Sequence, residues 1–505
     1  MKKSEIMSGK LMERKDKEGE LVDMEEAIAY LKTTRPTFYR WLRSGRIKGM
    51  KIGRQWRFYR SDLDRFLRGQ DPQIALTADL SPLIDALNKK AAELGIKLAT
   101  TKPEEDISPL APAVELIIVL AAKMRASSIH IASQVRSGQD EPLGSIRIRI
   151  DGVLHLLAEF DNRLQRAIVE RWKIMANCDL HETAKPQDGR IQINVEGKKL
   201  DLRIAFVPTV LGEALTVRIL DANAVKLDFE SMPFNSGDKE KIRSNLRTPW
   251  GIVLCTGPAG SGKTTTLYSC LNLMNTPSSN LISIEDPVEY LLPGVTQIPL
   301  RPGQGLTFAG AMRSVLRQDP DIIMVGEIRD QESLMMMQEA ALTGHLVLRT
   351  LHTENAAAAL QRMIEIGVPP FLVADSTRMV IAQRLLRVLC PKCKRPVALA
   401  PDLLASAERL ARKGGLDWDR MEKNFHEAVG CAECRQTGFR GRTLAAEVLE
   451  MTPQIGEALR RAASVDELQS VAISQGMTSM AADGVRRAAL GQTTLSEVFR
   501  ILPIH

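Results

Sequence analysis

The chain has 505 residues, of which 44% are hydrophobic and 26% are charged, proportions typical of a soluble globular protein with several domains. Its 68 Lys and Arg residues only slightly outnumber its 61 Asp and Glu residues, so the placement of the basic residues is more informative than the net charge of +7. No run approaches the ~18 apolar residues of a membrane span, and no apolar segment follows the N-terminus as in a signal peptide. The sequence therefore predicts a cytoplasmic protein, one that can still dock on a membrane.

The N-terminal region divides into a charged lead-in and a small basic domain. Residues 1–20 lack hydrophobic periodicity and are expected to be disordered. Residues 21–68 predict helices at 24–31 and 35–43, followed by a short hairpin and a closing helix. From Leu21 to Leu67, eleven basic residues stand against five acidic ones. A basic helix–turn–helix followed by a basic hairpin predicts contact with duplex DNA.

This basic domain resembles the excisionase-like, winged helix–turn–helix modules in residues 37–42, 52–58 and 61–63. In that family the second helix enters the major groove. The resemblance implies that bases are contacted by Arg35, Thr37, Tyr39 and Arg40, and phosphates by Arg54. The alternative is a helix–turn–helix that docks another protein and leaves its charges solvated.

A linker and an α+β domain follow. Residues 69–111 contain several prolines and predict a linker with one helix, at 83–94. The next region, residues 112–230, begins with a helix at 114–123 and continues with strands that alternate apolar and polar side chains. The strands are expected at 145–154, with a turn at Asp151-Gly152, and at 191–195, 199–205 and 213–220.

The chain is organised around a glycine-rich loop, residues 257–264. An apolar run that predicts a buried strand ends at Thr256, and a segment suited to a helix follows the loop. The loop matches the P-loop pattern G-x-x-x-x-G-K-[ST], in which backbone N–H groups at a helix N-terminus surround phosphate oxygens. Lys263 is expected to reach the β- and γ-phosphates of ATP, and the Thr264 hydroxyl to bind Mg²⁺. The predicted nucleotide contacts are Gly257, Pro258, Ala259, Gly260, Ser261, Gly262, Lys263, Thr264 and Thr265.

Further stretches resemble the secretion ATPases of the type II secretion and type IV pilus assembly family. They lie at residues 127–131, 149–154, 186–190, 211–213, 281–290, 321–330 and 343–353. The resemblance implies an α/β fold, in which a small, PAS-like α+β domain at 112–230 precedes a RecA-like P-loop ATPase core at 231–389. It further implies a homohexameric ring that hydrolyses ATP beside an inner-membrane platform protein. The helix–turn–helix stands where that family has its membrane-docking domain, so the partner stays open.

The same resemblance assigns roles to acidic and histidine side chains after the P-loop. Glu285 is the candidate general base that polarises the attacking water, although a carboxylate at a strand end can also cap the next turn. Glu327 stands at the Walker B position and is expected to hold Mg²⁺ with Thr264. His345 and His352, expected within one strand, contact phosphate or relay the bound state, unless they are merely structural.

Two arginines of the α+β domain also match that family. Arg203 and Arg218 correspond to arginines that bridge to the nucleotide when the domains close. The alternative is a pair of ordinary exposed arginines on a sheet.

Four of the seven cysteines form two C-x-x-C pairs, Cys390 with Cys393 and Cys431 with Cys434. Four thiolates suit a closed, tetrahedral Zn²⁺ site, so residues 390–445 predict a zinc-binding module. The alternative is a set of unrelated free thiols. The remaining cysteines are expected in the core: Cys178, Cys255 and Cys270.

The last region, residues 446–505, predicts a helical domain with helices at 455–462, 465–473 and 480–488. Taken together, the motifs predict an ATP-hydrolysing hexameric motor of the type II secretion or type IV pilus class. The alternative function is a DNA-binding regulator or DNA-linked motor, whose DNA contact is gated by the ATP state.

Overall fold

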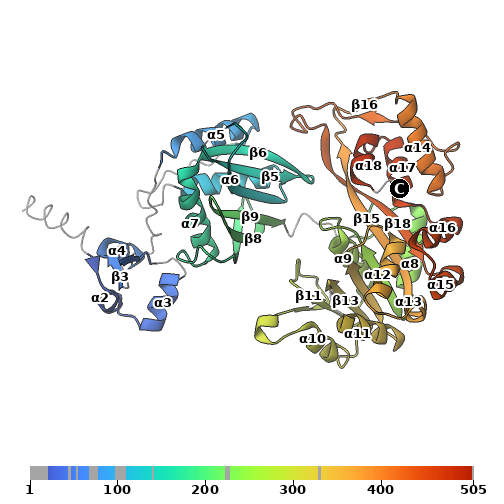
Figure 1. The fold of residues 1–505 in the computed structure, drawn as a ribbon, viewed down its shortest axis with the longest axis horizontal. Helices are drawn as coiled ribbons and strands as arrows, with labels where there is room; N and C mark the ends of the chain where they lie inside the picture. Colours follow the sequence, from blue (N-terminus) through green and yellow to red (C-terminus); the bar gives the residue numbers. More distant parts are fainter. Residues whose placement is uncertain are drawn as a thin grey trace, which may run out of the picture. The chain divides into compact units, whose positions relative to one another are not determined.

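The computed structural model describes residues 21–43, 47–52, 55–67, 78–96, 110–138, 141–221, 228–327 and 331–502 (Figure 1). The expected disorder of residues 1–20 lies outside them. The chain divides into two compact units, Met1–Ala224 and Val225–His505. Among the described helices, none has both the length and the apolar content needed to cross a membrane.

Unit 1 begins with the small basic domain. Its elements are β1 (Leu21–Val22), α2 (Met24–Tyr30), α3 (Arg35–Arg43), β2 (Met50–Ile52), β3 (Gln55–Tyr59) and α4 (Arg60–Leu67). Asp23 and Glu26 form a capping box that starts α2. Phe38 of α3 packs edge-on against Phe58 of β3, with ring centroids 5.1 Å apart, so helices and sheet share one core. The predicted helices and hairpin are confirmed, and β1 adds a strand that the sequence pattern does not predict.

The rest of unit 1 is an antiparallel sheet with helices on one face. Its helices are α5 (Ser81–Glu93), α6 (Ala111–Lys123), η1 (Asn162–Leu164) and α7 (Gln165–Ala176). Its strands, in the order β6-β5-β4-β9-β8-β7, are β4 (Ser128–Gln134), β5 (Leu143–Ile150), β6 (Val153–Asp161), β7 (Gln187–Val195), β8 (Lys198–Thr209) and β9 (Gly212–Asp221). The β5–β6 turn is tight because Asp151 and Gly152 both have positive φ.

Side chains alternate between the two faces of this sheet. Ile129 and Val217 are fully buried in the core that the helices cover, whereas Arg203 lies on the other face. The helix expected within the linker forms as α5 and buries Leu83 and Leu87 in the same core. This helix is therefore part of the α+β domain's packing.

Unit 2 contains a seven-stranded sheet in its described residues, in the order β12-β11-β13-β14-β10-β15-β18. Every neighbouring pair is parallel except β15 with β18, which is antiparallel. The strands are β10 (Gly251–Thr256), β11 (Leu281–Glu285), β12 (Val295–Pro299), β13 (Ile322–Glu327), β14 (Leu346–Leu351), β15 (Thr377–Leu389) and β18 (Phe439–Glu450). A mostly parallel sheet brings the carboxyl ends of its strands to one edge, where α/β proteins bind ligands.

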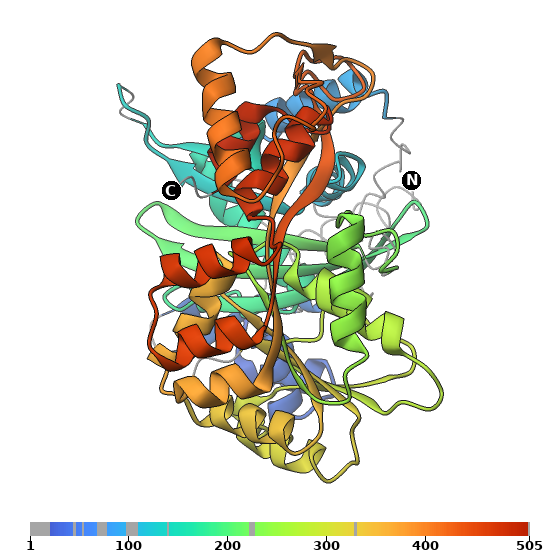
Figure 2. The ribbon, with the colours of Figure 1, turned by 90° about the vertical axis from the view of Figure 1, so that its right-hand side faces the viewer.

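Helices cover both faces of this sheet (Figure 2). The green helices α8 (Ser236–Leu246) and α9 (Lys263–Met274) pack on the face that carries Val253 and Cys255. The face that carries Ile252 and Leu254 packs against later helices, drawn from olive to red. These include α10 (Phe308–Val315), α11 (Gln331–Leu342), α12 (Ala356–Glu365) and α13 (Pro370–Ser376), and a short turn, η2 (Pro302–Gln304), precedes α10.

β18 crosses the predicted limit between the zinc-binding module and the C-terminal domain. The boundary expected between residues 445 and 446 falls inside this strand, which belongs to the central sheet. The insertion between the cysteine pairs forms β16 (Arg395–Pro396), α14 (Pro401–Lys413) and β17 (His426–Glu427). After β18 the described residues form four helices, one more than predicted: α15 (Pro453–Arg460), α16 (Val465–Ser474), α17 (Met480–Ala489) and α18 (Leu495–Ile501).

Candidate nucleotide site and cysteine cluster

The P-loop joins β10 to α9 at the carboxyl edge of the sheet. Gly257, Gly260 and Gly262 have φ values of 146°, 75° and 91°, which side chains other than glycine rarely tolerate. No described atom lies within 4 Å of the place where a side chain at Gly260 would begin. No described side chain caps the N-terminus of α9, so its first-turn amides remain available to an anion.

Polar side chains inside the loop also fit a phosphate. Lys263 is 8% exposed, and its Nζ lies 2.8 Å from the carbonyl oxygen of Gly257 and 3.4 Å from Nδ1 of His352. The buried Ser261 hydroxyl has no hydrogen-bond partner among the described residues. Thr264 is half-buried at the start of α9, where its hydroxyl can hold Mg²⁺. The loop thus offers a cation, amides and a hydroxyl to a nucleotide.

Glu285 ends β11 and is 4% exposed. Its Oε1 accepts hydrogen bonds from Ser283 Oγ at 2.6 Å and Gln297 Nε2 at 3.1 Å, and its Oε2 accepts one from Tyr268 of α9. Burial and the bond to Glu285 raise the pKa of the Tyr268 phenol, so this group stays a donor. The described hydrogen-bond donors to the Glu285 carboxylate are side chains of β11, β12 and α9 rather than backbone N–H groups of a following turn. The general-base role stays a prediction.

The structure places the backbone of Glu327 at the end of β13, opposite Thr350 of β14 across a bulge. β13 lies between β11 and β14, so the strand that ends in Glu327 is central at this edge. Its side chain lies outside the described part of the chain. Magnesium binding by Glu327 stays a prediction.

The two histidines lie at opposite ends of β14 rather than within it. His352 follows the strand at the P-loop edge, near Lys263. His345 precedes the strand, and its Nδ1 lies 2.9 Å from the carbonyl oxygen of Ala340, at the end of α11. The prediction that His345 contacts phosphate is therefore wrong for the P-loop of its own chain, because six strand residues separate it from that edge. A relay role for His345 stays a prediction.

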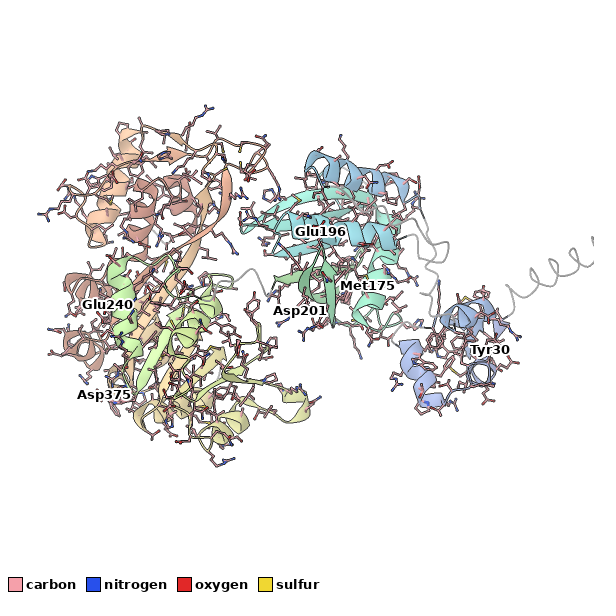
Figure 3. The ribbon with its side chains drawn as sticks, turned by 180° about the vertical axis from the view of Figure 1, so that it is seen from behind. Tyr30, Met175, Glu196, Asp201, Glu240 and Asp375 are labelled. Atoms are coloured by element: carbon pink, nitrogen blue, oxygen red, sulfur yellow. The ribbon has the colours of Figure 1, made fainter. Side chains whose placement is uncertain are left out.

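Arg203 and Arg218 stand directly opposite each other on β8 and β9 of unit 1. Arg190 of β7 pairs with Arg203 on its other side, so three arginines form a row across the sheet. Asp201, labelled in Figure 3, lies 2.6 Å from Nε of Arg190 and 4.0 Å from Nε of Arg203. Contact between this row and a nucleotide on unit 2 stays a prediction.

Four of the five predicted DNA contacts can be located. Arg35 and Arg40 are exposed on α3, and Thr37 and Tyr39 are half-buried beside the packed Phe38. Arg54 lies outside the described residues. The net positive charge and the exposed arginines fit an acidic partner, and DNA contact stays a prediction.

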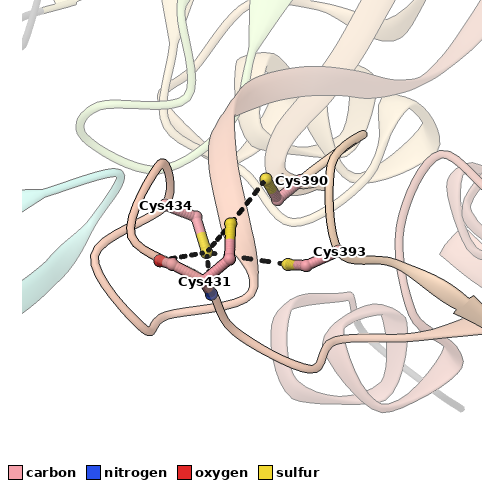
Figure 4. Close-up of side chains that lie close together, drawn as sticks. All are labelled: Cys390, Cys393, Cys431 and Cys434. Atoms are coloured by element: carbon pink, nitrogen blue, oxygen red, sulfur yellow. Dashed lines mark hydrogen bonds between the residues drawn. The ribbon is translucent and has the colours of Figure 1, made fainter.

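The four cysteines of the C-x-x-C pairs meet at one point (Figure 4), with all sulfur atoms within 4.8 Å of one another. The Cys390–Cys431, Cys393–Cys434 and Cys431–Cys434 sulfur separations are 3.9, 3.7 and 3.7 Å. A tetrahedral site with Zn–S bonds of about 2.3 Å requires sulfur atoms about 3.8 Å apart. The cluster therefore fits Zn²⁺, with no ligand position left open for catalysis.

Backbone amides prepare this cluster for a cation. Burial raises the pKa of Cys434, but the N–H groups of Cys431 and Gly438 donate to its sulfur and bring its pKa down to about 7. In contrast, burial raises the pKa of Cys270 to about 12. Cys270 and the likewise buried Cys178 and Cys255 lie in the core, as predicted.

Sequence reasoning missed two residues that pack against the site. The Tyr268 hydroxyl donates a hydrogen bond to the Glu285 carboxylate. The side-chain amide of Gln383, in β15, donates to the carbonyl oxygen of Ser261 in the P-loop. A signal for Gln383 exists, because strand alternation places it on the buried face with Met379 and Ile381. An uncharged polar residue on such a face needs a buried partner.

Comparisons with known proteins agree with this geometry. The sequence pattern of the family described as type II/IV secretion system protein matches residues 103–500, and a helix-turn-helix domain pattern matches residues 21–71. The type IV pilus assembly ATPase PilB of Myxococcus xanthus is 41% identical over 395 residues, which cover 78% of this chain and 68% of that protein. The type II secretion system protein HxcR of Pseudomonas aeruginosa is 41% identical over 400 residues, covering 79% of this chain and 78% of that protein.

Solved structures show the same fold. The ATPase DotB of Legionella pneumophila matches with a TM-score of 0.56 at 19% identity, covering 77% of this chain and 94% of that one. The pilus retraction motor PilT with bound ADP matches with a TM-score of 0.50 at 25% identity, covering 76% of this chain and 95% of that one.

Proposed function

Since the chain belongs to the type II/IV secretion system protein family and is an ATPase of that family, we propose that it powers assembly of a type IV pilus or a type II secretion pseudopilus. It works as a homohexameric ring on an inner-membrane platform protein. The observation that carries the proposal is the P-loop, whose uncapped amides, Ser261 hydroxyl and Lys263 lie where β11, β13 and β14 end.

The side chains at this edge divide the work of phosphoryl transfer. Lys263 and the α9 amides bind the phosphates and offset their charge, and His352 lies close enough to Lys263 to sense the γ-phosphate. Thr264 and Glu327 hold Mg²⁺, which supplies further charge neutralisation. Glu285 orients the attacking water after giving up one of its side-chain donors. Arg203 and Arg218 reach the phosphates when the units close.

The test combines turnover with assembly state. The full chain is expected to hydrolyse ATP and, with a nonhydrolysable analogue, to form particles of six times its 55.9 kDa mass. Lys263→Ala is expected to lose nucleotide binding, while Lys198→Ala, at an exposed hairpin position, keeps it. Cross-linked pull-down from the native cells is expected to recover a platform subunit. A chain that binds ATP but stays monomeric and captures no platform protein contradicts the motor.

A second candidate function rests on the helix-turn-helix match and on the exposed Arg35 and Arg40. In it, the chain is a DNA-linked motor or regulator whose grip on duplex DNA depends on bound ATP. Stimulation of ATP hydrolysis by duplex DNA, but not by platform protein, favours this candidate over the pilus motor.

A further inference from the structure

Gln383 lies in the middle of β15 and is fully buried, 0% exposed. The preceding residue, Ala382, pairs with Thr256, the last residue of β10 before the P-loop. The P-loop rests directly on Gln383, because a β-carbon at Gly257 would lie 2.4 Å from the Gln383 carbonyl oxygen. A β-carbon at Gly262 would lie 3.2 Å from Nε2 of the same residue.

The side-chain amide of Gln383 bridges three segments. Its Nε2 donates to the carbonyl oxygen of Ser261 at 2.8 Å, inside the P-loop. Its Oε1 accepts from Thr266 Oγ1 at 2.8 Å in the first turns of α9 and from Cys255 Sγ at 3.4 Å at the end of β10. The hydroxyl donor and the carbonyl acceptor together fix which end of the amide is which.

This contact determines where one P-loop N–H points. The carbonyl of Ser261 and the N–H of Gly262 belong to one trans peptide, in which these two groups point in opposite directions. A carbonyl held toward the buried Gln383 therefore aims the Gly262 N–H away from the protein, toward the phosphates. Glycine at 262 allows the peptide to rotate, so the orientation needs an anchor.

We propose that Gln383 is a positioning residue for the nucleotide, which holds the Ser261–Gly262 peptide in the orientation that binds phosphate. The inference rests on the proposed ATP site at this P-loop. The bond acts equally on bound ATP and on the transition state, so its loss raises Kd and KM more than it lowers kcat.

The experiment measures Kd of a fluorescent ATP analogue, KM, kcat and Tm for the full chain. Gln383→Leu is expected to raise Kd and KM about 5- to 10-fold, the usual range for one buried hydrogen bond, with kcat changed less than threefold. Gln338→Leu is the matched control, because Gln338 is another fully buried glutamine of unit 2 and accepts a bond from Ser376, away from the P-loop. It is expected to lower Tm and leave Kd unchanged.

A second variant separates positioning from packing. Gln383→Met keeps the length of the side chain but has no N–H to donate to the Ser261 carbonyl, so Kd is expected to rise about as much as in Gln383→Leu. Thr266→Val removes the hydrogen bond to Oε1 of Gln383 and leaves the bond from Nε2 to Ser261, so Kd is expected to change less than twofold. Wild-type Kd in either Gln383 variant overturns the inference while Lys263→Ala still abolishes binding. Failure of the unaltered chain to bind the analogue overturns the proposed site as well.

Discussion

At the scale of single residues, Glu285 could act as a general base or as a structural anchor. Its carboxylate accepts hydrogen bonds from three side-chain donors, which hold it in place. If it polarises water, Glu285→Gln keeps ATP binding and lowers kcat by about 10²- to 10⁴-fold, the usual contribution of a general base. Single-turnover hydrolysis with a parallel binding measurement checks this. Ser283→Ala, which removes one donor and leaves the carboxylate, is the control and is expected to retain most turnover. Near-normal turnover of Glu285→Gln would instead make this residue an anchor between β11 and α9.

Asp238 in α8 links stability to pH. Burial and the nearby Asp483 raise the pKa of Asp238 from 3.8 to about 6. The folded state then binds the proton more tightly than the unfolded state, so stability falls as pH rises from about 4 to about 6, by up to about 3 kcal/mol. Asp238→Asn is expected to remove this decline, as measured by urea unfolding of variant and parent at pH 4, 5, 6 and 7. Parallel pH profiles for the two proteins would contradict the assignment.

Residues that act through local sequence patterns are predictable, and residues that act through distant partners are not. The P-loop and the C-x-x-C pairs are recognised from spacing, because each motif holds its own geometry. Gln383 and Ser261 are 122 positions apart, so their hydrogen bond depends on strand order, which one sequence does not reveal. The phosphate contact predicted for His345 is wrong for a related reason. The exact start and end of β14 decide at which edge of the sheet each histidine lies, and the sequence does not give these limits.

At the scale of elements, β15 and β18 connect the cysteine cluster to the nucleotide edge. Cys390 directly follows β15, and its N–H donates to the carbonyl oxygen of Gly438, next to β18. A metal bound by both cysteine pairs would therefore hold the end of β15 close to the start of β18. The pairing also explains why a boundary placed at residue 445 cuts an element, because β18 completes the sheet from beyond the insertion.

Cys393→Ser is expected to lower the zinc content from one per chain toward zero and to reduce Tm by about 5 °C or more, because metal-binding energy contributes to folding energy. Elemental analysis and thermal unfolding check the two effects. Cys178→Ser, at a buried cysteine of unit 1 outside the cluster, controls for the loss of a thiol and is expected to leave zinc unchanged. Full zinc content in Cys393→Ser would contradict the four-thiolate site.

At the scale of the whole molecule, the chain joins a basic module to an ATPase that has its own core. Helix periods and charge counts predict both parts, because each packs a separate hydrophobic core. The binding partner of the basic module is less predictable, because exposed arginines can bind either DNA or an acidic protein surface. If the basic module binds DNA, a ring of six modules would raise a weak single contact to useful avidity, and assembly would then strengthen DNA binding.

DNA binding is therefore best tested in the full chain, with and without the nonhydrolysable ATP analogue that is expected to promote assembly. The unaltered chain is expected to bind duplex DNA more tightly when assembled, with a steep dependence on salt. Arg40→Ala is expected to weaken binding about 10-fold per module and to make the salt dependence shallower, because an exposed cation of α3 is lost. Arg362→Ala, an exposed arginine on α12 of unit 2, is the control and is expected to bind normally. If the unaltered chain does not bind duplex DNA even at 50 mM salt, the basic module is a protein-docking domain, and its arginines then face acidic side chains of a partner protein.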